Sequence, residues 1–101
     1  MPESQAQLPT VDVCAVMVTY RPDVALLRRA IAAIAPQVGG VVLVDNATRC
    51  DAFDAIAAEL MSEGGRVLRN PGNLGLAAGF NAGIDAAREA GFGHVLLLDQ
   101  D

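Results

Sequence analysis

Short apolar runs alternate with amphipathic segments along the chain. Residues 11–19 (VDVCAVMVT) are rich in β-branched side chains and predict a buried strand. Asp23 is placed to cap a following helix, which Pro36 and the pair Gly39 and Gly40 would end. The apolar positions of this helix recur at spacings of three and four, so they share one face: Val24, Leu27, Ile31 and Ile34.

A second strand and a second helix follow. Residues 41–44 predict a short strand that runs directly into Asp45 and Asn46. The next helix is expected to begin near Asp51 and to end at Gly64. Its buried stripe is expected to consist of Phe53, Ile56, Ala57 and Leu60.

The rest of the chain predicts a strand, a loop, a helix and a final strand, over residues 66–69, 70–76, 77–90 and 94–98. Strands and helices therefore alternate in the order βαβαβαβ. Strands joined by helical crossovers pair in parallel, and their apolar runs need cover on both faces. The pattern predicts an α/β, Rossmann-like parallel sheet with helices on both faces. Residues 1–10 are polar and are expected to form a flexible leader before one domain, residues 11–101.

Composition and charge exclude several partners and chemistries. The 101 residues are 52% hydrophobic and 19% charged, which is typical of a folded domain. The net charge of −5 argues against nucleic-acid binding, because affinity for phosphate backbones depends on clustered Lys and Arg. All seven basic residues are arginines, so reactions that need an active-site Lys are excluded.

The cysteines and the apolar runs indicate a cellular compartment. Cys14 and Cys50 are too few for a disulfide framework and no signal peptide precedes them, so a reducing cytoplasmic location is expected. No apolar run is long enough to cross a bilayer. Peripheral association with the inner face of the membrane is compatible with the sequence.

Polar residues gather where the predicted strands end. In such sheets ligands bind at the carboxyl ends of strands, where the strand order reverses; for the common order 3-2-1-4 this lies between the first and fourth strands. Residues 19–23 (TYRPD) contain no Gly, which excludes a standard dinucleotide site. Asp99 and Asp101 follow the last strand. Two such carboxylates can hold Mg²⁺ or Mn²⁺ against phosphate oxygens, although an acidic turn without a metal is the alternative.

Glycines recur every four residues in the segment before the last strand. Gly75, Gly79 and Gly83 would share one helix face, and each costs about 1 kcal/mol relative to Ala in a helix. Close packing of the helix on the sheet is the expected reason at Gly83. A helix start that approaches a ligand, with hydrogen bonds from Asn73 and Asn81, is the other explanation for the segment.

Four motifs occur in order at the predicted strand ends: VTYRP at residues 18–22, VDN at 44–46, NxGxAxGxN at 73–81 and LLLDQD at 96–101. Taken together they resemble the N-terminal half of a family 2 glycosyltransferase with the GT-A fold. The resemblance covers residues 11–101 and is strongest to bacterial rhamnosyltransferases, in which the last motif typically contains LLDQD.

The resemblance implies roles for individual residues. Asp45 would read a pyrimidine base, Asp99 would lie near the ribose, and Asp101 would bind the metal with Asp99 as a second ligand. The cofactor would be Mg²⁺ or Mn²⁺. The residues expected to bind the nucleotide sugar are Thr19, Tyr20, Arg21, Asp45, Asn46, Asn73, Gly75, Asn81 and Asp99.

The implied reaction is an inverting transfer of rhamnose from dTDP-rhamnose to a cell-surface polysaccharide or a lipid-linked acceptor. The family places its catalytic base and acceptor-binding half after the D-x-D motif. We therefore expect the donor-binding part alone, with no catalytic residue, and self-association through uncovered apolar surface. The alternatives are a non-catalytic α/β module that binds a nucleotide or Mg²⁺ for regulation, and a structural interaction domain that binds through its sheet edge.

Overall fold

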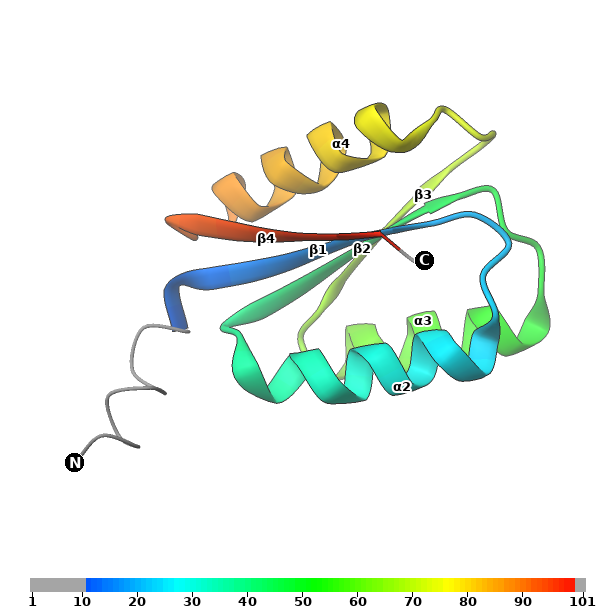
Figure 1. Ribbon diagram of the computed structural model, residues 1–101, viewed down its shortest axis with the longest axis horizontal. Helices are drawn as coiled ribbons and strands as arrows, with labels where there is room; N and C mark the ends of the chain where they lie inside the picture. The colour runs from blue at the N-terminus through cyan, green and yellow to red at the C-terminus, as the bar shows by residue number, and fades with distance from the viewer. Residues whose placement is uncertain (1–10, 100–101) are drawn as a thin grey trace.

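A computed structural model describes residues 11–99, which form a four-stranded sheet with helices on both faces (Figure 1). All neighbouring strands are parallel and their order is β3-β2-β1-β4. The predicted α/β class and strand order are therefore confirmed. The leader expected at residues 1–10 and the expected metal ligand Asp101 lie outside the described residues. The elements are β1 (Val13–Thr19), α2 (Val24–Ile34), the short 3-10 helix η2 (Ala35–Gln37), β2 (Gly40–Asn46), α3 (Asp51–Ser62), β3 (Arg66–Asn70), α4 (Leu76–Glu89) and β4 (His94–Asp99).

Several strand ends differ from the prediction. β1 begins at Val13, because residues 11 and 12 form 3-10 backbone instead of extending the strand. At their carboxyl ends β2 and β4 are longer than predicted, since the parallel ladder continues through the pairs Thr19 with Asp45 and Val18 with Asp99. Thr19, Asp45, Asn46 and Asp99 are thus held by the sheet, whereas Tyr20 and Arg21 lie in the loop after β1.

Helices α2 and α3 cover one face of the sheet, as Figure 1 shows below the strands. The carboxylate of Asp23 caps α2 as predicted, with its Oδ1 3.1 Å from the backbone nitrogen of Leu26. The four residues expected as the buried stripe of α3 are all buried. The core of this face contains Ala15, Met17, Leu27, Val41, Leu43, Phe53, Ile56, Ala57 and Leu60.

Helix α4 alone covers the other face (Figure 1), and its residues pack very close to β1. A Cβ added at Gly79 would come within 2.7 Å of Cγ1 of Val18, and one added at Gly83 would overlap Val16. Close packing is therefore the reason for Gly83, as expected, and also for Gly79. Gly75 does not belong to this stripe, because it is the N-cap of α4 with a φ of 89°, a conformation that favours glycine.

Strand β4 is left partly uncovered at the edge of the sheet. Val95, Leu96 and Leu97 are 38%, 39% and 44% exposed, because α4 packs over β1 and β2. The expected self-association through such a surface stays a prediction. Within residues 11–99, no helix combines the length and apolar character needed to cross a bilayer.

The close approach of α4 predicts the effect of adding a methyl group. In an open helix Gly→Ala stabilises by about 1 kcal/mol, but Gly83→Ala places the new Cβ against Val16 and is expected to destabilise the fold by about 1 to 3 kcal/mol. Gly72→Ala is the control, since its Cβ would meet nothing within 4 Å. Urea denaturation followed by circular dichroism measures both; a Gly83→Ala variant at least as stable as the parent would refute this packing.

Candidate functional site

A pocket lined by both polar and apolar residues opens between the carboxyl ends of β1 and β4, beside the start of α4. It has a volume of about 240 Å³, and we call it the switch-point pocket. Six of the nine residues expected to bind a nucleotide sugar meet here, at the place where the strand order reverses. The lining residues are Val18, Thr19, Tyr20, Asn46, Asn73, Gly75, Leu76 and Asp99.

Asn46 ties three elements together in the wall of this pocket. Its side chain is only 2% exposed. Nδ2 of Asn70, at the end of β3, donates to Oδ1 of Asn46 at 2.8 Å, and Nδ2 of Asn46 lies 3.4 Å from the carbonyl oxygen of Gly75. Oδ1 of Asn73 accepts the N–H of Gly75 at 3.0 Å. The amide side chains therefore fix the loop before α4, so that the helix begins at the pocket.

Asp45 lies on the opposite face of the sheet and does not line the switch-point pocket. Adjacent residues of a strand point to opposite faces, so Asn46 faces α4 while Asp45 faces the side of α2 and α3. Oδ1 of Asp45 accepts hydrogen bonds from the hydroxyls of Thr19 at 2.8 Å and Thr48 at 2.6 Å. Oδ2 accepts the backbone N–H of Thr48 at 2.7 Å. The carboxylate is fully buried in this network, and its expected contact with a base stays a prediction.

Two further expected residues also lie outside the switch-point pocket. Arg21 has a left-handed φ of 49° and its guanidinium lies over the ring of Tyr20, 5.1 Å from the centroid. It lines a neighbouring depression with Thr48. Asn81 is exposed on α4; it follows the buried Gly79 by two residues, about 200° around the helix, and therefore points away from the sheet.

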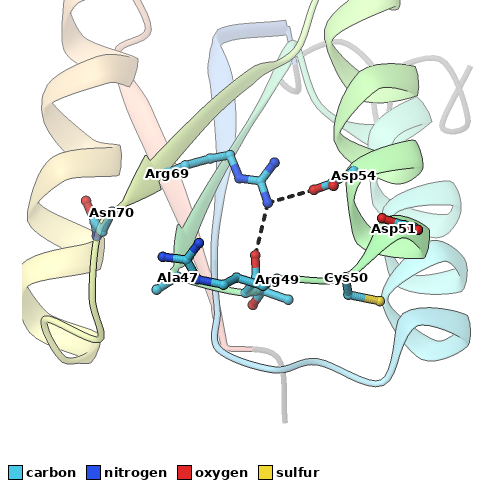
Figure 2. A pocket seen from close by; sticks show the side chains of 8 residues that line it. Ala47, Arg49, Cys50, Asp51, Asp54, Arg69 and Asn70 are labelled. Carbon is cyan, nitrogen blue, oxygen red and sulfur yellow. Dashed lines mark hydrogen bonds and ion pairs between the residues drawn. The ribbon is translucent and has the colours of Figure 1, made fainter.

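A second and larger polar pocket lies between the end of β3 and the start of α3 (Figure 2). Arg69 reaches across it from β3 to an ion pair with Asp54 on α3, with 2.8 Å between Nη2 and Oδ1. The same Nη2 donates to the carbonyl oxygen of Thr48 at 3.0 Å, and the guanidinium lies 5.2 Å from the ring centroid of Phe53. Arg69 is committed to these partners, and none of the nine residues expected to bind a nucleotide sugar lines this pocket, so it is the weaker candidate. Its volume is about 660 Å³, and its lining is Ala47, Thr48, Arg49, Cys50, Asp51, Asp54, Arg69 and Asn70.

The described part of the chain offers limited metal-binding chemistry. Among residues 11–99 no group of three or more His, Cys, Asp and Glu side chains could hold a metal ion. Asp99 is exposed and lines the switch-point pocket. Asp101 lies beyond residue 99, so its position relative to Asp99 is not described.

Comparison with known protein families decides what kind of domain carries this pocket. Residues 14–101 match the family model described as glycosyl transferase family 2. The chain belongs to glycosyltransferase family 2. The resemblance based on the four motifs is thereby confirmed at the level of the family, and the family's chemistry is glycosyl transfer from a donor to an acceptor. Neither the curated proteins nor the solved structures include a significant match.

The geometry of this family 2 domain also shows which residues the sequence reasoning missed. Thr48 and Asn70 hold the site together, but their partners Arg21 and Asn46 lie 27 and 24 residues away in the chain. For Thr48 a local signal exists, since a Thr three residues after an Asp can donate back to its carboxylate. For Asn70 no local signal exists, because its bond crosses between two strands.

The buried carboxylate of Asp45 predicts that its replacement by an amide of the same shape strongly lowers the stability of the fold. Asp45→Asn keeps the shape of the side chain but presents an NH₂ group to at least one of its hydrogen-bond donors, so we expect a loss of at least about 2 kcal/mol of stability. Asp85→Asn is the matched control, because Asp85 is 71% exposed in a 3.7 Å surface ion pair and should change stability by less than about 0.5 kcal/mol. Urea denaturation of the two variants measures the difference. Equal stability of the two variants would contradict a structural role for the Asp45 network.

Proposed function

We propose that this domain binds the donor of a metal-dependent, inverting glycosyltransferase, and that the donor is a nucleotide-diphosphate sugar. Membership of family 2 supports glycosyl transfer. The observation that carries the more specific proposal is the switch-point pocket, in which residues far apart in the sequence converge beside Asp99. In this proposal residues 11–101 are the donor-binding part of a GT-A domain, and no residue among them is assigned as the catalytic base.

The pocket offers complementary groups for each part of such a donor. Tyr20 lines the pocket and is 37% exposed, with the guanidinium of Arg21 over its ring, and an aromatic side chain of this kind is suited to contact a base. Asn73 is exposed and carries an amide group suited to ribose hydroxyls. The hydroxyl of Thr19 and the amide of Asn46 are buried in bonds to Asp45, Asn70 and Gly75, so these two side chains shape the wall of the pocket. A volume of about 240 Å³ is smaller than that of most sites for whole cofactors, so we assign the pocket to the ribose and diphosphate, with the base against Tyr20.

A divalent metal fits the oxygen donors and the charge of this site. Mg²⁺ and Mn²⁺ are commonly held by one or two carboxylates and by substrate phosphates, without an all-protein cage. Asp99 supplies one carboxylate in the pocket, and we propose Asp101 as the second. When bound, the metal would act as a Lewis acid on the leaving diphosphate and would supply positive charge that the described lining of the pocket, which contains neither Lys nor Arg, lacks.

The finer proposal is that the sugar is rhamnose, supplied as dTDP-rhamnose. It is supported by the similarity of the LLLDQD segment at residues 96–101 to the corresponding motif of bacterial rhamnosyltransferases. The acceptor would be a cell-surface polysaccharide or a lipid-linked saccharide. The reaction would then take place on the cytoplasmic side of the membrane, with the domain as a peripheral protein.

Calorimetric titration with dTDP, UDP and NAD, each with and without Mn²⁺, tests the donor class. We expect Mn²⁺-dependent binding of a pyrimidine nucleoside diphosphate and none of NAD. Asp99→Asn and Asp101→Asn should each weaken binding in Mn²⁺ at least about tenfold, the effect of losing about 1.4 kcal/mol. Asp85→Asn, on the exposed face of α4, should bind like the parent protein.

Other outcomes of this titration would count against the proposal. Absence of binding by every nucleotide, or binding of NAD as tight as that of dTDP, would contradict the donor class. Binding that is unchanged without Mn²⁺ and in both Asp variants would contradict the metal. Competition of dTDP-rhamnose against dTDP-glucose and UDP-glucose then tests the sugar, since equal affinities would remove the support for rhamnose.

A further inference from the structure

Thr48 lies at the centre of the hydrogen-bond network behind the switch-point pocket. It is 7% exposed. Its hydroxyl donates to Oδ1 of Asp45 at 2.6 Å and accepts the backbone N–H of Arg21 at 3.0 Å. Its own N–H donates to Oδ2 of Asp45 at 2.7 Å, and its carbonyl oxygen accepts from Arg69 at 3.0 Å. Every polar group of this residue is used, and together they join the ends of β1, β2 and β3.

The bonds of Thr48 hold two strained positions. Arg21 and Ala47 have φ values of 49° and 63°, in the left-handed region that side chains with a Cβ rarely adopt. Such conformations persist only where the surroundings enforce them, and they cluster at functional sites. The hydroxyl of Thr48 binds the N–H of Arg21, and the N–H of Thr48 fixes the peptide that follows Ala47.

The turn at Arg21 directly follows residues that line the switch-point pocket. Arg21 follows Tyr20 and lies over its ring, and both Tyr20 and Thr19 line the switch-point pocket. The hydroxyl of Thr19 shares Oδ1 of Asp45 with the hydroxyl of Thr48. Thr48 itself is not a lining residue of this pocket, so any influence on a ligand there passes through Arg21 and Asp45.

We propose that Thr48 is a positioning residue of the donor site. Its hydroxyl holds the loops after β1 and β2 in the geometry that presents Tyr20 to a nucleoside diphosphate, beside the buried Thr19 in the wall of the pocket. The part of this inference that concerns the ligand rests on the proposed function. The loop geometry does not, so it can be tested on the protein without ligand.

The hydroxyl can be removed or kept by small substitutions. Thr48→Val replaces the hydroxyl with a methyl group of similar size, Thr48→Ala removes it without adding a group against Asp45, and Thr48→Ser retains it. Without ligand, we expect the backbone amide NMR signals of residues 19–21 to shift or broaden in the Val and Ala variants and to stay in place in the Ser variant. Unchanged signals in a folded Val or Ala variant would overturn the proposal.

The second arm measures the dissociation constant for dTDP or UDP in the presence of Mn²⁺. We expect Thr48→Val and Thr48→Ala to bind about tenfold more weakly than the parent, and Thr48→Ser to bind within about twofold. Ile56→Val is the control for a general loss of stability, because Ile56 is buried under the sheet in α3, away from the pocket. Weakening by Ile56→Val as great as by Thr48→Val, or no rescue by Ser, would refute a positioning role.

The two arms separate this inference from the function proposed above. If the parent protein binds none of the nucleotides, the proposed function fails, while the amide signals of residues 19–21 still decide whether the hydroxyl sets the loop geometry. If the parent binds a nucleoside diphosphate and the Val and Ala variants bind it equally well, the positioning role fails and the proposed function stands.

Discussion

A carboxylate buried at the end of a central strand is stable only when protein donors replace its water, and Asp45 meets this condition with three hydrogen bonds. Because Thr19 and Thr48 supply those donors, the loops after β1 and β2 are fixed to each other. The next residue, Asn46, faces the other side of the sheet and binds Asn70 and Gly75. Two consecutive side chains of β2 thus organise the polar network on both faces of the sheet.

The position of α4 adds a steric constraint to this polar one. Glycines lower helix stability, yet Gly79 and Gly83 let α4 approach Val18 and Val16 more closely than any residue with a Cβ would allow. Because of this close approach, the start of α4 lies at the carboxyl end of β1, where Gly75 and Asp99 line the same pocket. Packing in the core and the shape of the pocket therefore have a common cause.

The elements and their order could be predicted from the sequence because apolar periodicity is a local signal. The site could be predicted only in part. The strand predicted from the sequence covers residues 41–44, so it gives no expectation of which sheet face Asp45 and Asn46 point to. Once β2 continues through Asn46, period two places Asp45 and Asn46 on opposite faces. Similarly, the position of Asn81 two residues after Gly79 is sufficient to place it on the face of α4 that points away from the sheet, outside the lining of the pocket. Contacts such as Asn70 with Asn46 depend on strand register, which no local pattern contains.

The charges around the switch-point pocket constrain any ligand that it binds. Its described lining contains the carboxylate of Asp99 and neither Lys nor Arg, while the nearby Arg21 is turned over the ring of Tyr20 and Arg69 is paired with Asp54. A diphosphate next to Asp99 would meet like charge, which disfavours binding by Coulomb repulsion unless a cation lies between them. A divalent metal between the two groups would cancel this repulsion, and Asp99 would then serve as one of its ligands. For a diphosphate donor, the electrostatics of this pocket thus support the proposed metal independently of the family to which the chain belongs.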